Sequence, residues 1–353
     1  MTATLLGPDL DFAIDPDHEA HEPPEASGRR RDDVRLMVSV GDEPPIDAHF
    51  AEFASFLDPG DVLVVNTSAT IGAAFTATLP DRTPVALHYS GSLPGELALV
   101  EVRSILGSTT APMRLAGPVT VSLDGGGSAR LLVRYRESER LWIALLELGT
   151  DLLAYADRHG RPIRYRHVDL PWPLETYQTV FSVVPGSAEM PSASRPFSHR
   201  MVTDLVNHGV TIVPVVLHAG VSSLEGAEQP YPERYAVSSE TARIVNDAHV
   251  RERRVVAVGT TVMRALATVT DDRGSVSAGQ GWTETVVTKS APVQSVSGLL
   301  TGWHEAESSH LLILDSIAST DALRQAYRRA VYEGYLWHEF GDLHLILSGR
   351  PQV

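Results

Sequence analysis

Cysteine is absent from all 353 residues of the chain. Without thiols the protein can form no disulfide, no thiolate-bound zinc or iron–sulfur cluster, and no cysteine nucleophile. Its 14 histidines still leave open a metal site made from imidazoles. None of them has H-x-x-x-H or H-E-x-x-H spacing on a predicted helix, however, so we assign no metal ligand.

Lysine is almost absent as well: Lys289 is the only one, and the formal net charge is −15. This balance argues against broad, non-specific binding to a polyanion and favours a cationic small substrate, while a local basic patch stays compatible with it. No apolar run is long enough to span a bilayer, and the first residues lack the pattern of a signal peptide. We therefore expect a cytoplasmic protein with no membrane partner.

Buried-type strands alternate with helix-like segments in two parts of the chain. This alternation predicts an α/β class, with a barrel-like, mostly parallel α/β domain formed by residues 1–67 and 150–353. Residues 68–149 between them carry short alternating runs, separated by turns that contain Gly and Pro. This pattern of short alternating runs and turns predicts an inserted small β-barrel domain.

A strand, a tight turn and a helix are predicted from the sequence 253–269, RRVVAVGTTVMRALATV. The apolar run 255–258 is typical of a strand buried on both faces, and Gly259 allows a sharp turn. Thr260 or Thr261 is a suitable N-cap for the helix that follows. The free N–H groups at such a helix start suit a carboxylate or a phosphate. The alternative is an ordinary strand-to-helix connection that binds nothing.

Polar residues follow several of the predicted strands. Asn66, His218 and the turn at Gly259 stand at three strand ends, and His304 follows a fourth strand closely. In a parallel array these ends converge on one face, where active sites lie. His218 and His304 are our acid/base candidates, because imidazole titrates near neutrality. A purely structural role stays open for each of them.

Several segments of the chain carry distinctive motifs: 11–12, 23–25, 57–66, 177–181 (Tyr-Gln-Thr-Val-Phe), 217–220 (Leu-His-Ala-Gly), 256–261 with Arg264, 299–301 with His304, and 340–342. In this order and spacing they resemble the S-adenosylmethionine:tRNA ribosyltransferase-isomerase family of queuosine biosynthesis, nearly end to end. We assign catalysis to the two strand-end histidines, His218 and His304. Substrate binding is assigned to Asn66, Tyr177, Gln178, Thr179, Gly220, Gly259, Thr260, Thr261 and Arg264.

The resemblance implies an α/β domain with an inserted β-barrel, and the use of S-adenosylmethionine as a ribosyl donor. The acceptor would be a 7-deazaguanine base of tRNA, which becomes epoxyqueuosine while adenine and methionine are released. S-adenosylmethionine would then be a substrate, and no cofactor is needed. The absence of cysteine fits, because the radical use of S-adenosylmethionine requires a cysteine-bound cluster.

Loops at the expected active face depart from the family pattern. Ser194-Arg195-Pro196 stands where the family has Gly-Leu-His, and Ser68-Ala69 stands where it has Thr-Arg. The main interpretation is the tRNA-modifying enzyme. The alternatives are a divergent paralogue that acts on S-adenosylmethionine or a related nucleoside with a small-molecule acceptor, and a non-catalytic binding protein of the same fold. Salt-dependent tRNA binding separates the first from the second, and adenine release separates both from the third.

Overall fold

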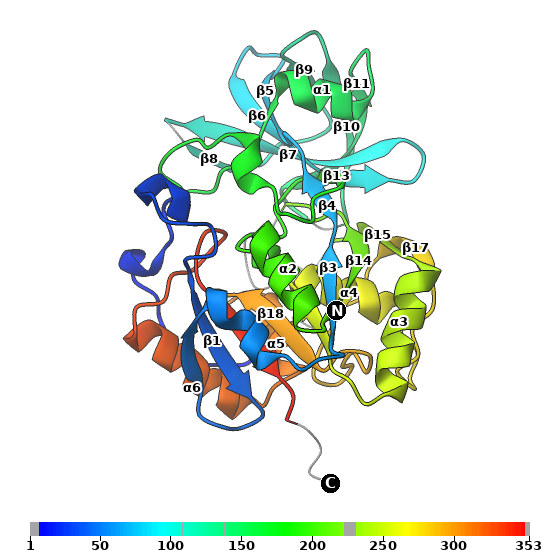
Figure 1. Cartoon of the computed structure of the whole chain (residues 1–353). Helices are drawn as coiled ribbons and strands as arrows, with labels where there is room; N and C mark the ends of the chain where they lie inside the picture. Colours follow the sequence, from blue (N-terminus) through cyan, green and yellow to red (C-terminus); the bar gives the residue numbers. More distant parts are fainter. Residues whose placement is uncertain (1–6, 108, 137, 222–230, 350–353) are drawn as a thin grey trace.

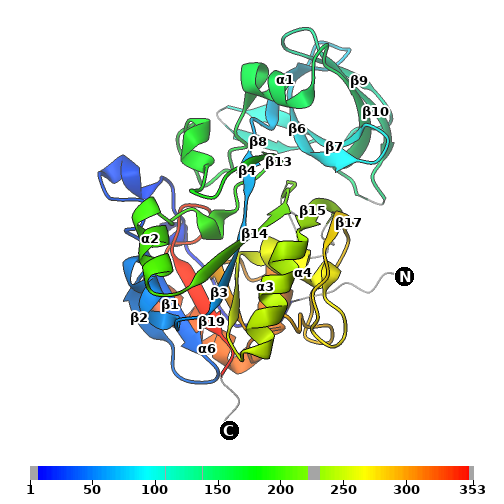
Figure 2. The same cartoon turned by 45° about the vertical axis from the view of Figure 1, so that its right-hand side comes forward.

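The structure is a computed structural model that describes residues 7–107, 109–136, 138–221 and 231–349. A large β-sheet covered by helices forms the lower part of the molecule in Figure 1, and a β-barrel forms the upper part. The turned view in Figure 2 shows the same two parts, with the strand pair β4 and β13 between them.

The secondary-structure elements have the following bounds. The strands are β1 (Arg35–Val40), β2 (Ile46–His49), β3 (Val62–Asn66), β4 (Ser68–Thr70), β5 (Ala74–Thr78), β6 (Pro84–Leu93), β7 (Leu97–Leu106), β8 (Thr109–Pro112), β9 (Thr120–Leu123), β10 (Ser128–Arg134), β11 (Leu141–Glu147), β12 (Gly160–Arg161), β13 (Val184–Ser187), β14 (Thr211–Leu217), β15 (Glu233–Val237), β16 (Val255–Val258), β17 (Gly279–Thr283), β18 (Gly298–Gly302) and β19 (Leu343–Leu347). The α-helices are α1 (Leu152–His159), α2 (His199–Asn207), α3 (Ser239–Val250), α4 (Thr260–Val269), α5 (His310–Asp315) and α6 (Thr320–Tyr332), and the 3-10 helices are η1 (Pro16–His18), η2 (Pro24–Ser27), η3 (Phe50–Phe56), η4 (Leu174–Tyr177) and η5 (Ser192–Ser194). Within the described ranges, no helix is both long enough and apolar enough to cross a membrane.

The large sheet has nine strands in the order β17-β15-β14-β3-β16-β18-β19-β1-β2. The pairs β14/β3, β3/β16, β16/β18 and β19/β1 are parallel, and the other four pairs are antiparallel. The prediction of an α/β class is confirmed, but the mostly parallel, barrel-like arrangement is not. The sheet is mixed and open. The sequence could not show this, because an apolar run indicates that a strand is buried but not in which direction it runs.

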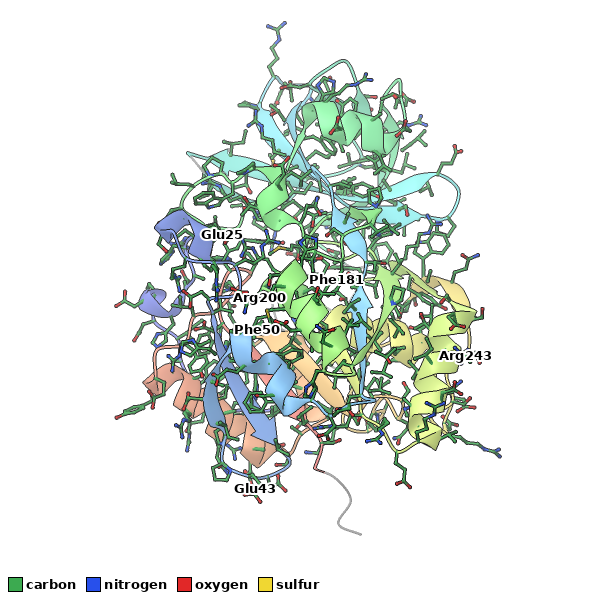
Figure 3. All side chains as sticks on the ribbon, in the orientation of Figure 1. Glu25, Glu43, Phe50, Phe181, Arg200 and Arg243 are labelled. Atoms are coloured by element: carbon green, nitrogen blue, oxygen red, sulfur yellow. The ribbon has the colours of Figure 1, made fainter. Side chains whose placement is uncertain are left out.

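Each central strand buries both of its faces. In β3, Val62 and Val64 pack into the apolar core on one side of the sheet, which includes residues of α3, α4, α5 and α6. Leu63 and Val65 pack into the core on the other side, which includes residues of α2 and η3. Alternate side chains of a strand point to opposite faces, so a continuous apolar run needs helices on both sides. Phe50 of η3, labelled in Figure 3, lies in this second core.

The barrel is closed by six strands in the order β11-β10-β9-β5-β6-β7, with the β7/β11 pair completing the ring. This confirms the predicted β-barrel. Helix α1 follows β11 and buries Tyr155 and Ala156 in the barrel core, and β12 pairs with β5. The domain boundaries at 67/68 and 149/150 stay a prediction.

Candidate active site between the sheet and the barrel

The ends of β14, β16 and β18 border a cavity of about 680 Å³ between the sheet and the barrel. Its lining includes strand-end residues 218–221, 259–261 and 301–305, residues 89–92 of β6, and residues within the connections 162–167, 185–193 and 338–339. Cavities of about 300–1,000 Å³ are typical of small-molecule sites. The carboxyl ends of parallel strands are also where α/β proteins place such sites.

His218 is the first residue after β14, and it lines the cavity. Its Nδ1 lies 2.7 Å from the hydroxyl oxygen of Ser68, which itself donates to Ser187 Oγ at 2.7 Å. With the Ser68 proton directed at Ser187, the Nδ1–H of His218 donates to Ser68, and Nε2 carries the lone pair. Burial, with a further contribution from Arg234, lowers the pKa of His218 to about 4. The ring is therefore neutral at pH 7 and able to act as a base.

Two glycines allow close approach of the backbone at this end of the cavity. A Cβ on Gly186 would lie 2.7 Å from the ring of His218, and one on Gly220 would lie 2.6 Å from Ser90 Oγ. Ser90 belongs to β6 of the barrel and accepts the N–H of Val221 at 3.1 Å. The barrel and the end of β14 are thus held together beside the histidine.

His304 also lines the cavity, two residues after β18. Its Nε2 lies 2.9 Å from Thr301 Oγ1, and its ring stacks on that of His310 with 4.4 Å between centroids. Burial lowers the pKa of His310 to about 4 and lowers the pKa of His304 as well. Both rings are neutral at pH 7, so the stacked pair carries no charge repulsion. Sequence reasoning missed His310, because the sequence alone does not show that the start of α5 lies next to His304.

The turn between β16 and α4 lines the cavity with Gly259, Thr260 and Thr261. Gly259 has φ +93° and is itself the N-cap of α4, so the prediction of a threonine N-cap is wrong. Glycine occupies this position because it adopts a positive φ without strain. The backbone N–H groups of Thr260 and Thr261 have no acceptor within the described part of the chain. They are free to bind an anion from the cavity.

Arg264 lines the cavity on α4, but its donors are already engaged. It forms an ion pair with Glu233 and donates to the carbonyl oxygen of Tyr231 at 3.0 Å. The second carboxylate oxygen of Glu233 accepts the N–H of Gly220 at 2.9 Å. In this state Arg264 therefore connects α4 to the turn after β14.

Three predicted binding residues are not part of the cavity lining. Asn66 bonds both backbone groups of Leu217, at 2.8 and 3.0 Å. Gln178 bonds both backbone groups of Thr70, at 3.1 and 2.7 Å, and Thr179 bonds within its own turn. These side chains position the segments around the cavity. The remaining predicted residues do line it: His218, His304, Tyr177, Gly220, Gly259, Thr260, Thr261 and Arg264.

The sequence model of the family described as "Queuosine biosynthesis protein" matches residues 8–346. The chain belongs to this family. It is 32% identical to the S-adenosylmethionine:tRNA ribosyltransferase-isomerase of Thermus thermophilus over 94% of this chain and 98% of that protein. It is 33% identical to the protein of the same name from Rubrobacter xylanophilus, over 97% of each. The crystal structure of the S-adenosylmethionine tRNA ribosyltransferase of Thermotoga maritima matches with a TM-score of 0.53 at 25% identity, over 96% of this chain and 100% of that one.

One segment in which the chain departs from the queuosine family pattern serves a structural purpose here. The guanidinium of Arg195 is 2% exposed and binds both carboxylate oxygens of Glu25, at 3.1 and 3.0 Å. It also lies over the ring of Phe340, 4.9 Å from the centroid. Glu25, labelled in Figure 3, is part of η2 in the N-terminal arm. Arg195 thus fixes the arm, while its neighbours Pro191 and Ala193 line the cavity.

We predict that the His218 ring stays neutral at about pH 5.5, where an unperturbed histidine with a pKa of about 6.5 is about 90% protonated. The reason is that protonation would place a charge in a buried site, which holds the pKa near 4. Long-range ¹H–¹⁵N NMR spectra of the histidine rings measure this, with His218→Gln to assign the signal. A titration midpoint near the unperturbed value would contradict the geometry described for the ring.

Proposed function

We propose that this chain is a ribosyltransferase-isomerase that uses S-adenosylmethionine as the ribosyl donor. The acceptor is a 7-deazaguanine base of tRNA, the product is epoxyqueuosine, and adenine and methionine are released. The observation that carries the proposal is the nearly full-length match to proteins named S-adenosylmethionine:tRNA ribosyltransferase-isomerase. The cavity supports it with space for a nucleoside and with histidines that are neutral at pH 7.

The first step of this chemistry needs a base. The positive sulfonium of the donor makes the neighbouring C5′ hydrogen acidic, and removal of that proton allows adenine to leave. An amine on the acceptor then attacks the sugar, and loss of methionine closes the epoxide. We assign the first proton transfer to Nε2 of His218, because Ser68 fixes the tautomer and burial keeps the ring neutral. His304, which follows the end of β18 at the same edge of the sheet, also borders the donor.

The start of α4 is the proposed site for the donor's methionine carboxylate. The N–H groups of Thr260 and Thr261, which have no acceptor among the described residues, and the positive end of the helix dipole both favour a negative charge. An exposed charge near a helix end is typically stabilised by about 0.3–1 kcal/mol, and by more where it is partly buried. Arg264 contributes to this site indirectly: its ion pair with Glu233 holds the start of α4 against Gly220.

A small-molecule acceptor is the second candidate. The net charge of −15 disfavours a polyanion, and the segment 194–196, which differs from the family pattern, lies beside cavity residues 191–193. The donor half of the reaction would be the same in both cases. The two functions therefore differ in what triggers adenine release.

The direct experiment is a chromatographic assay for adenine and methionine with purified protein and S-adenosylmethionine. We expect release that depends on tRNA carrying an aminomethyl-7-deazaguanine base, because the acceptor amine must trap the activated sugar. Release without tRNA would favour the small-molecule acceptor. An absence of release with every acceptor, while calorimetry still detects the donor, would reject the enzymatic proposal.

We predict that His218→Ala lowers this turnover by about 10²–10⁴-fold, the range expected when a general base is removed. His304→Ala should also lower it, through the loss of the cavity wall beside Thr301. The matched control is His199→Ala, an exposed histidine at the start of α2. If both cavity variants turn over as fast as this control, the assignment of His218 and His304 is wrong.

A further inference from the structure

A second pair of stacked histidines lines the same cavity. His167 comes from the connection before η4, and His338 from the connection between α6 and β19. Their rings lie 3.8 Å apart between centroids, with 13° between the planes. Nε2 of His167 lies 2.6 Å from a carboxylate oxygen of Glu339, which also lines the cavity. Glu19 of the N-terminal arm lies 3.7 Å from Nε2 of His338.

A small apolar core fixes these polar side chains in place. Ala20, Val168 and Phe340 are all buried in one cluster, and each is adjacent in sequence to one of the polar residues. His338 has φ +72°, a conformation that non-glycine residues adopt with strain. Residues held in such conformations cluster at functional sites, provided that the surrounding structure determines them. Here the apolar cluster supplies that support.

Tyr177 adds a free donor to this wall. The residue is 4% exposed and lines the cavity, and its hydroxyl group has no hydrogen-bond partner in the described ranges. Burial, together with the nearby Glu339 carboxylate, raises the pKa of Tyr177 to about 12, so the hydroxyl keeps its proton. Buried polar groups in folded proteins nearly always have a partner. The Tyr177 hydroxyl therefore has an unused donor, and a ligand atom that reaches it on binding would supply the missing partner.

His167 differs from the other histidines that line the cavity. Among His167, His218, His304, His310 and His338, it is the one with a carboxylate within hydrogen-bond distance in the described structure. When Nε2–H donates to Glu339, Nδ1 of the neutral ring carries the lone pair. The carboxylate then holds the ring in one orientation and leaves Nδ1 as its acceptor. This is the arrangement of a base held by an acidic partner.

We propose that His167, Glu339 and Tyr177 form the acceptor side of the cavity, where the protonated amine of the acceptor binds and His167 takes its proton. The inference rests on the proposed function, which requires a free amine as nucleophile. One N–H bond of the ammonium breaks, and one N–H bond forms at Nδ1 of the imidazole. The amine keeps the electron pair, and the positive charge moves to His167 beside Glu339. Tyr177 donates to a polar atom of the same ligand.

In this proposal the donor and the acceptor therefore contact different parts of the cavity wall. His218 and the start of α4 serve the donor, and the wall formed by His167, Glu339 and Tyr177 serves the acceptor. Removal of the acceptor base should leave donor binding intact and slow only the steps that need the amine. This separates a catalytic role of His167 from a general contribution to folding.

The test compares His167→Ala, His167→Gln and Glu339→Gln with His199→Gln, an exposed histidine outside the cavity. Turnover is measured as methionine release with S-adenosylmethionine and tRNA carrying the aminomethyl-7-deazaguanine base, because methionine leaves only after the amine has attacked, and donor binding is measured by calorimetry without tRNA. We expect kcat of the His167 variants to fall by about 10²–10⁴-fold while donor binding is unchanged. Imidazole added to the buffer should restore part of the turnover of His167→Ala, but not of Glu339→Gln.

Turnover of the His167 variants equal to that of His199→Gln would overturn the inference and leave the proposed function intact. Reduced turnover without rescue by imidazole, together with lost donor binding, would also overturn it, because the residue would then be structural. If the unmodified protein shows no turnover with this tRNA, the proposed function fails first and the inference falls with it. Turnover of the unmodified protein therefore distinguishes failure of the proposed function from failure of the inference about His167.

Discussion

The side chain of Asn66 holds together three of the segments that shape the cavity. It bonds both backbone groups of Leu217 at the end of β14 and donates to Thr261 Oγ1 at 3.3 Å. The chain then continues from β3 into β4, where Ser68 fixes the ring of His218. The passage from sheet to barrel and the orientation of the candidate base therefore depend on the same few residues. The buried amide of Asn66 stabilises this junction because its donors and acceptors are all paired, and its loss would leave several buried groups without a partner.

Burial decides the electrostatics of the site. In an acidic protein, nearby carboxylates could keep imidazoles charged, but His218, His304, His310 and His338 all have lowered pKa values, chiefly through desolvation. Neutral rings stack without repulsion and can accept protons. His167 stands apart through its contact with Glu339. The same cavity can therefore hold one base for a C–H proton and another for an ammonium proton.

The sequence predicted the fold where a pattern reports directly on burial. The runs at 62–66 and 255–258 are central strands, and residues 68–149 contain the barrel strands. It could not predict that β18 and β19 run antiparallel, because direction depends on the connection through α5 and α6. His218 and the Gly259 turn were found because they stand at strand ends. His167 and Glu339 lie on irregular connections far apart in sequence, and only the packing of Ala20, Val168 and Phe340 brings them together.

The proposed function requires the cavity between sheet and barrel to bind S-adenosylmethionine in one orientation. A crystal structure of the protein with S-adenosylmethionine tests this most directly. We expect the methionine carboxylate within hydrogen-bond distance of the Thr260 and Thr261 amides, and the C5′ carbon next to Nε2 of His218. A donor bound outside the cavity, or one with its carboxylate away from the start of α4, would contradict it.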